Sequence, residues 1–358
     1  MRTVSPASGK RLLQVLLGSA AAAVLVWLAF RGTDWPAVAA ILRRADGRWI
    51  AASQVLLVSS HLLRVRRWTA IVRAALPVAY RTVLIVAQVG FLANVTLPMR
   101  LGEGVRAVLL SRRTGARIST SLALVALDRA SDLLGFLFVA VIALAAFPVR
   151  RDVVVPAGAL GNAEPWVLSG SLLGPLVLGA AVALAAVLAV LLVLSAGRST
   201  AAVERWTWLP PAARARLAGA AGGFAAGMGV FGSRRGMVGS TSASVAAWLS
   251  AVASLACLSR AFGLETAWYV AFVMQTLIAL FAAAPIAPGL LGQFHLAVIA
   301  CLLLAAPGVG LTEARAAALG IHVFSILPVV ALGLLGLVLD RTRPEPVSAA
   351  GAGGRRAR

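Results

Sequence analysis

The chain has 358 residues, 60% of them hydrophobic, and a formal net charge of +21. Soluble domains are closer to half apolar, and several runs here exceed the roughly 18 residues that mark a membrane span. The composition therefore excludes a soluble globular protein and indicates a polytopic membrane protein. The charge would suit nucleic acid, but Lys10 is the only lysine and the arginines lie mostly between the apolar runs. That distribution is typical of the positive-inside bias, so we expect no nucleic-acid partner.

The apolar runs, in chain order, fall at 12–30, 49–63, 82–98, 118–147, 166–195, 237–262, 267–284, 290–305 and 314–339. The first follows a basic start, and no small-x-small cleavage site precedes Arg31, so an uncleaved span is favoured over a signal peptide. We expect 1–11 to be a cytoplasmic segment, 12–340 an integral membrane domain, and 341–358 a disordered, basic cytoplasmic tail.

The distribution of arginine predicts the topology. If every run crossed the membrane, the basic loop 99–117 would face outside, against the positive-inside rule. If 82–110 instead enters and returns as a broken hairpin, the basic stretches and both termini face the cytoplasm. Runs 267–284 and 290–305 are joined by the short apolar linker AAAPIAPGLLGQFHL, which predicts a second broken hairpin entering from outside. The expected fold is an all-α membrane bundle of about six full spans and two re-entrant hairpins, whose matching breaks suggest an inverted repeat.

The end of the third run is broken by Pro98 and Gly102. Arg100, Glu103 and Arg106 recur there every three residues, so one helical face would hold all three. One carboxylate between two guanidiniums leaves net positive charge, and the arginine fork suits a phosphate. We therefore predict a site for an anionic lipid headgroup. The alternative is an interfacial anchor of lipid-facing arginines, which would not need the Pro and Gly break.

The long run 118–147 contains three charged residues within LVALDRASDLLGF, namely Asp128, Arg129 and Asp132. Asp128 lies about 15 Å along a helix from the start of the run, which is mid-membrane. Charges are costly there unless paired, and they mark transport pathways, so we assign the trio to the same headgroup site. The trio is net negative, and an arginine of the preceding hairpin could balance it. The alternative is a structural ion-pair lock.

The second hairpin is broken by Pro288, Gly289 and Gly292, and His295 follows the break. His322 lies in the last apolar run. A lone buried histidine is usually a satisfied core residue, whereas two in neighbouring elements of one suspected site indicate a functional pair. Both interpretations stay open on the sequence alone.

The stretch HLLRVRRW places Arg64, Arg67 and Trp68 on one helical face. We interpret them as snorkelling cations with a tryptophan at the cytoplasmic interface. The basic stretch 198–236, which contains two tryptophans, is predicted to be a surface-lying amphipathic segment attracted to anionic lipid. The sequence has no Walker A motif, glycine-rich nucleotide fingerprint, GxSxG or His/Cys metal cluster, so we expect neither cofactor nor metal.

Four stretches together, LPMRLGEGVRAVLL, ALDRASDLL, APIAPGLLGQFHLA and HVFSILPVVALG, resemble the flippase-like membrane domain of the lysylphosphatidylglycerol synthase family. The likeness extends over about residues 50 to 340 and is most specific in the pattern LPxRxGExxR. The resemblance implies an integral membrane protein that moves or handles lipids. In aminoacyl-phospholipid synthases a soluble transferase domain follows and makes the modified lipid; it has no counterpart in this chain, so synthesis is not implied.

The resemblance also implies which positions are functional: Arg100, Glu103, Arg106, Arg129 and Asp132. The chain departs from the family pattern at three places. Asp128 stands where a Glu is usual, His295 also stands where a Glu is usual, and His322 stands where an Arg is usual. The last two changes replace opposite charges with imidazoles that can keep a contact, and they count against any mechanism that needs a carboxylate in the second hairpin.

We therefore expect a non-enzymatic, multi-pass protein of the cell membrane that translocates anionic phospholipids or polyprenyl-phosphate-linked lipids. The headgroup would bind between the two hairpins, with Arg100 and Arg106 holding phosphate and Glu103 and Asp132 holding those arginines. The alternative is an accessory subunit of a cell-envelope glycosyltransferase or lipid-synthesis complex, whose partners would be envelope-biosynthesis proteins. A third hypothesis, an enzyme acting on lipid phosphates, would need a metal-binding acid cluster.

Overall fold

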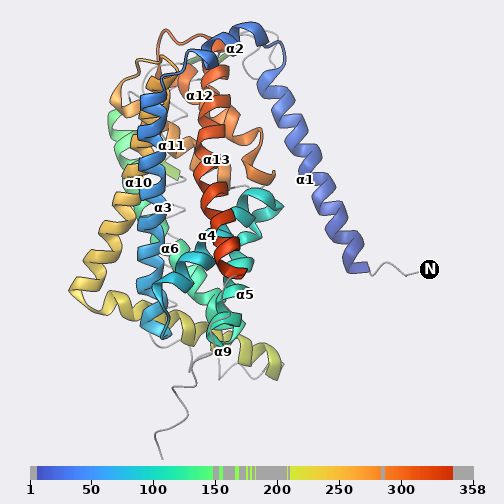
Figure 1. Ribbon diagram of the computed structural model, residues 1–358, viewed down its shortest axis with the longest axis vertical. Helices are drawn as coiled ribbons and strands as arrows, with labels where there is room; N and C mark the ends of the chain where they lie inside the picture. The colour runs from blue at the N-terminus through green and yellow to red at the C-terminus, as the bar shows by residue number, and fades with distance from the viewer. Residues whose placement is uncertain are drawn as a thin grey trace, which may run out of the picture.

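The computed structural model describes residues 6–147, 210–283 and 287–341, together with short pieces and single residues between 153 and 208. Helices make up nearly all of this part of the chain and form a long bundle (Figure 1). Two three-residue strands, β1 (Val153–Val155) and β2 (Trp166–Leu168), pair antiparallel. Apart from β2 and a few single residues, the predicted span 166–195 lies outside the described residues, as does the tail beyond Arg341. The predicted count of about six full spans therefore stays a prediction.

Most of the long helices follow the predicted apolar runs in chain order, whereas the helices at Trp35–Arg43 and Pro211–Met228 lie between runs. Their bounds are α1 Pro6–Phe30, α2 Trp35–Arg43, α3 Gly47–Ala75, α4 Tyr80–Thr96, η1 Pro98–Arg100, α5 Gly102–Thr114, α6 Ile118–Ala146, α9 Pro211–Met228, η2 Gly229–Gly232, α10 Arg234–Ala261, α11 Trp268–Ala283, η3 Pro288–Leu290, α12 Gln293–Ala305 and α13 Leu311–Arg341. Four of the described segments are long and apolar enough to cross a membrane, and the bent pair of α1 and α2, which meet at 87°, could form a fifth crossing. The chain is a multi-pass membrane protein.

The two broken hairpins are confirmed. The first consists of α4 and α5 joined through η1, and the second of α11 and α12 joined through η3. Figure 1 shows α5 toward the lower end of the bundle and α12 toward the upper end, so the hairpins come from opposite ends. Their turns meet, because a Cβ placed on Gly289 would lie 3.2 Å from the carbonyl oxygen of Val95.

The two turns share a backbone conformation. In η1, Pro98 is followed by Met99 and Arg100 with φ of 57° and 52°. In η3, Pro288 is followed by two residues with φ of 59° and 58°. Left-handed φ is unfavourable for residues with a Cβ, so each turn stores strain that the packed helices around it must hold. This likeness fits the predicted inverted repeat, which stays a prediction.

The helix α3 is longer than the apolar run 49–63 predicted. It continues as one helix to Ala75, through basic residues that the distribution of arginine places on the cytoplasmic side. The reason is that Arg64 and Arg67 lie on its inner face, where they pair with carboxylates of α6. Charge therefore does not mark the end of this helix.

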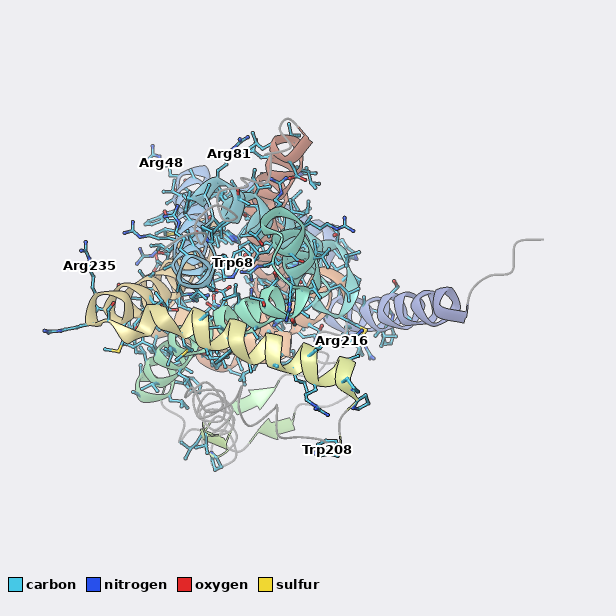
Figure 2. The ribbon with its side chains drawn as sticks, turned by 90° about the horizontal axis from the view of Figure 1, so that it is seen from below. Arg48, Trp68, Arg81, Trp208, Arg216 and Arg235 are labelled. Atoms are coloured by element: carbon cyan, nitrogen blue, oxygen red, sulfur yellow. The ribbon has the colours of Figure 1, made fainter. Side chains whose placement is uncertain are left out.

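The helix α9, which falls within the predicted surface segment 198–236, lies across the lower end of the bundle (Figure 1). Gly219, Gly223 and Gly227 recur every turn and pack against α6. Figure 2 looks at this end and shows Arg216 on α9 and Arg235 near the start of α10. One face of α9 thus packs on protein, while Arg216 on another face is exposed.

Two hydrophobic clusters stabilise the bundle, with the charged residues of α6 between them. Toward the lower end, Leu124 of α6 packs in a cluster with Trp68 of α3. Toward the other end, Phe136 of α6 packs in a cluster with Trp248 of α10. Asp128 and Asp132 lie between these two levels on the same helix.

Candidate functional site

Arg67 of α3 is the centre of a buried ion-pair network. Its Nη2 lies 2.8 Å from an oxygen of Asp128, and its Nη1 lies 2.8 Å from an oxygen of Asp132. The two carboxylates are one turn apart on α6, so one guanidinium reaches both. Nη1 also donates to Ser244 Oγ of α10 at 2.6 Å. Because Arg67 is only 2% exposed, these bonds tie three helices together inside the protein.

Arg106 of α5 is held from three sides. Its Nη2 lies 2.8 Å from Asp128 and its Nη1 lies 3.2 Å from Glu103. Its guanidinium stacks 3.9 Å above the ring of Trp68. The side chain is fully buried, with 0% exposure. Arg106 is therefore the arginine of the first hairpin that balances a carboxylate of α6, as expected. Its burial argues against the predicted role of holding a phosphate.

Three further arginines lie at the edge of this network and are partly or largely exposed. Arg64 binds Asp132 at 2.6 Å and is partly exposed. Arg129 binds Glu103 at 3.0 Å and lies 3.8 Å from Asp132, with 36% of its side chain exposed. Arg100 is exposed and has no ion-pair partner among the described residues. Arg100 is thus the guanidinium most available to a ligand.

The prediction that Arg100, Glu103 and Arg106 share one helical face is wrong for Arg100. Arg100 belongs to η1 and has φ of 52°, so it precedes α5 rather than lying on it. Glu103 and Arg106 lie on α5 and form the expected i,i+3 pair. The break therefore separates the exposed arginine from the buried one.

The network carries net positive charge. Five arginines, namely Arg64, Arg67, Arg100, Arg106 and Arg129, face three carboxylates, namely Glu103, Asp128 and Asp132, which leaves an excess of two positive charges. Such an excess in a sheltered site attracts an anion.

Two cavities open onto the same charged groups. One, of about 360 Å³, lies between the first hairpin, α3, the second hairpin and α13. The other, of about 960 Å³, lies between α6, α10 and α11. Arg64, Arg100, Glu103, Arg129 and Gln275 line both cavities. The two cavities therefore share one polar centre and are otherwise lined mainly by apolar side chains.

The second hairpin contributes a chain of hydrogen bonds to the first of these cavities. The N–H of Gly292 donates to His295 Nδ1 at 3.3 Å, so the His295 proton must be on Nε2. His295 Nε2 then donates to His322 Nδ1 at 3.1 Å, and His322 Nε2 donates to the carbonyl oxygen of Gly289 at 2.9 Å. Backbone groups at both ends thus fix the two tautomers. The expected contact between the imidazoles is present.

The predicted residues lie in three kinds of place. Arg100, Glu103, Arg129, Gly289 and His322 line the cavity between the hairpins, and Asp132 lines the larger cavity. Asp128, Arg106 and His295 lie behind them and hold neighbours in place. Pro288 lines a separate apolar space beside α1.

The interpretation of Arg67 and Trp68 as snorkelling residues at a membrane surface is wrong. Trp68 has 0% exposure, and Arg67 lies among carboxylates rather than at a lipid surface. The physical reason is that Asp128 and Asp132, about 60 residues away in the chain, offer these side chains a paired interior position. Arg64 alone of the three retains partial exposure, and it faces the two cavities.

Sequence reasoning missed three polar contributors. Asn94 donates to Glu103 at 3.1 Å, and the indole N–H of Trp248 donates to Asp132 at 3.2 Å. Gln275 of α11 lines both cavities. The position of Asn94, just before the Pro98 break, was a usable signal. Trp248 and Gln275 lie singly in apolar runs, where no pattern singles them out.

The described part of the chain has no group of three or more His, Cys, Asp or Glu side chains placed to hold a metal ion. Its buried carboxylates are each bound by arginine. The site is therefore rich in guanidinium groups, which are the side-chain groups that bind anions such as phosphate.

Comparison with known protein families identifies the family of the chain. Residues 15–333 match the family model described as the lysylphosphatidylglycerol synthase TM region. No curated protein matches the chain. The match covers nearly all of the sequence and includes both hairpins, the charged centre and most of the last helix. The chain belongs to the lysylphosphatidylglycerol synthase transmembrane-region family.

Proposed function

We propose that this protein translocates lipids with an anionic headgroup, such as an anionic phospholipid or a polyprenyl-phosphate-linked lipid. The observation that carries the proposal is the pair of cavities that share Arg64, Arg100, Glu103, Arg129 and Gln275. A headgroup bound at these residues would lie between two spaces, each walled mainly by apolar side chains.

The charges favour a phosphate. Arg100 has no ion-pair partner among the described residues and lines both cavities, so its fork can take a phosphate in two hydrogen bonds. Arg129 forms an ion pair with Glu103, but its side chain remains partly exposed. Glu103 binds Arg106 and Arg129, so it would position these two arginines. Asp132 binds Arg64 and Arg67 instead of the predicted Arg100 and Arg106.

The walls favour lipid chains. Phe91, Leu97 and Phe294 line the cavity between the hairpins, while Phe136 and Ile278 line the larger one. A lipid whose headgroup moved from one cavity to the other would have apolar walls around it in both. Its phosphate would stay bound to guanidinium groups throughout. Paired broken helices at membrane depth are typical of transport sites, which supports the same proposal.

The proposed location is the cell membrane, with both termini on the cytoplasmic side. The exposed arginines at the lower end of the bundle, including Arg216 and Arg235 in Figure 2, support this orientation under the positive-inside rule. The protein would act without its own nucleotide site, and lipid would be its ligand.

The test is lipid movement by the purified protein. Proteoliposomes would carry fluorescent phosphatidylglycerol, and a membrane-impermeant quencher would report how fast it crosses. Loss of one charge-assisted contact should slow transfer by about tenfold or more in Arg100→Gln and Arg129→Gln. The matched control is Arg48→Gln, because Arg48 is exposed and lines neither cavity.

Two results would contradict the proposal. If liposomes with wild-type protein move lipid no faster than empty liposomes, the protein does not translocate lipid by itself. That result would favour the accessory-subunit hypothesis. If Arg100→Gln transfers lipid as fast as Arg48→Gln does, the headgroup does not bind at the proposed central site.

A further inference from the structure

A third cavity, of about 470 Å³, lies between α3 and the first turns of α10, outside the central site. Arg66, Arg235, Gly239 and Ser240 are among its lining residues. Arg67 lines it as well, so the wall of this cavity is also the edge of the buried ion-pair network. We call it the α3–α10 pocket.

Ser240 is the first sign of a ligand. Its side chain is 3% exposed, and its Oγ has no hydrogen-bond partner among the described residues. A buried hydroxyl without a partner costs free energy, so it is usually matched by something that the protein itself does not supply. The oxygen of a ligand in the α3–α10 pocket would supply that partner.

The charge of the α3–α10 pocket indicates which ligand. Arg66 and Arg235 are both exposed, and neither forms an ion pair with another described residue. The described lining contains no carboxylate to neutralise them. Two unpaired guanidiniums and a hydroxyl donor are the groups that bind a phosphate.

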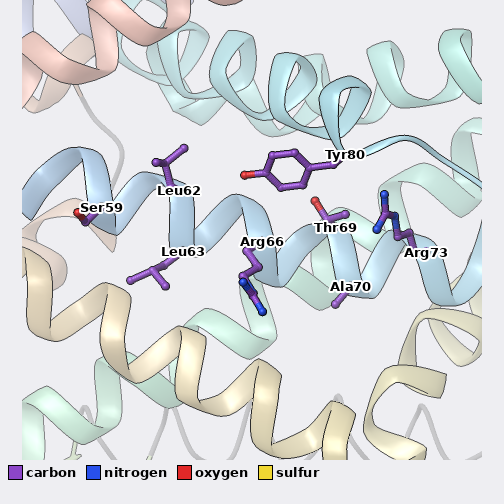
Figure 3. Close-up of a pocket in the computed structure, with 8 residues that line it drawn as sticks. All are labelled: Ser59, Leu62, Leu63, Arg66, Thr69, Ala70, Arg73 and Tyr80. Carbon is purple, nitrogen blue, oxygen red and sulfur yellow. The ribbon is translucent and has the colours of Figure 1, made fainter.

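An apolar groove continues from this pocket along α3. The groove has a volume of about 830 Å³ and shares Leu63, Arg66 and Ala70 with the α3–α10 pocket. Figure 3 shows Arg66 pointing toward the side of α10, whereas Arg73 points toward Tyr80. Leu63 lines both the groove and the charged pocket, so an apolar side chain lies where the two meet.

We infer that the α3–α10 pocket binds the phosphate of a lipid whose acyl chain lies in the α3 groove. A free phosphate would use the charged pocket but not the adjoining apolar groove, so the continuity of the two selects a lipid. This site is separate from the central cavities and does not depend on translocation. Arg67 joins the two, because it lines this pocket and binds Asp128 and Asp132.

Gly239 allows a sharp test. It lines the pocket, and a Cβ added there meets nothing within 4 Å. Gly239→Glu would place a carboxylate beside the arginines, whereas Gly239→Gln has the same shape without the charge. The two variants should fold alike and differ in phosphate binding.

The experiment uses the full chain in phosphatidylcholine vesicles that contain a photoactivatable phosphatidic acid with its diazirine on the acyl chain. Cross-linked peptides would be mapped by mass spectrometry. We expect labelling of the α3 groove, reduced by roughly fivefold or more in Gly239→Glu and retained in Gly239→Gln. Arg216→Gln, which changes an exposed arginine at the same end outside the pocket, should label as the wild type does.

Three outcomes decide the inference. Equal groove labelling in Gly239→Glu and Gly239→Gln would overturn it. Full displacement of the lipid label by millimolar inorganic phosphate would show that free phosphate, not lipid, is the occupant, and would also overturn it. Groove labelling that depends on charge and resists phosphate would support it, even if the central cavities carry no label. Failure of the central site would therefore be seen separately.

Discussion

His295 and His322 form a direct hydrogen bond, with 3.1 Å between Nε2 of the first and Nδ1 of the second. The bond joins the second hairpin to the last helix, and backbone groups of Gly292 and Gly289 complete the chain at either end. The turn of the hairpin is therefore held by side chains from two elements. This explains how an uncharged pair can hold a position where the family pattern has opposite charges.

His322→Phe should destabilise the second hairpin. Phenylalanine keeps the stacking on Phe294 but leaves the Nε2–H of His295 and the carbonyl of Gly289 without their buried partners. Two such losses cost about 2–4 kcal/mol, so thermal unfolding in detergent should begin several degrees lower. His322→Gln can restore the donor to Gly289 and should lose less. Equal midpoints for Phe and wild type would show that the hydrogen-bond chain does not support the turn.

Gly102→Ala should disrupt the first hairpin. A Cβ at this position would lie 2.1 Å from the carbonyl oxygen of Gly90 in α4, and backbone cannot move aside as a flexible side chain can. We expect a loss of roughly 2 kcal/mol or more, measured as a lower unfolding temperature or a lower yield of monodisperse protein.

The control for this change is Gly104→Ala, two residues along the same helix. A Cβ at Gly104 meets nothing within 4 Å, and alanine favours a helix over glycine. This variant should be as stable as the wild type or slightly more so. If both alanine variants unfold alike, the close approach of α4 and α5 is not what shapes this hairpin.

Arg67→Met should be among the most damaging single changes. It removes the guanidinium that binds Asp128 and Asp132 and leaves buried negative charge short of a partner. Breaking a buried pair in this way costs about 3–5 kcal/mol, so little folded protein is expected by size-exclusion chromatography. Arg66→Met changes the exposed neighbouring residue in the same helix and should fold normally. Normal yield of Arg67→Met would show that the network is dispensable for folding.

Much of the fold could be predicted from local pattern. Pro98 with Gly102 and Pro288 with Gly292 break apolar runs that are otherwise long enough to cross the membrane, and both breaks are real. The end of α3 could not be predicted in this way. Its arginines look like a cytoplasmic boundary until Asp128 is known to face them, and that contact depends on packing between distant segments.

Most charged residues of the site were also predicted, whereas Arg64 and Arg67 were assigned to the membrane surface instead. The different roles of the predicted arginines could not be predicted. Periodicity treats Arg100 and Arg106 alike, because both lie three residues from Glu103. The left-handed φ of Arg100 and the stacking of Arg106 on Trp68 separate them. Both facts come from tertiary structure, which turns one arginine toward a cavity and the other into the core.

The meeting of the two turns has an electrostatic consequence. Each hairpin brings one helix to its carboxyl end at the break, at Thr96 or Ala283, and starts another there, at Gly102 or Gln293. The peptide dipoles give these ends partial charges of about half an elementary charge, negative at the first kind and positive at the second. Two of each kind largely cancel. The main chain around the two turns is thus nearly neutral, and the net charge of the site comes from its side chains.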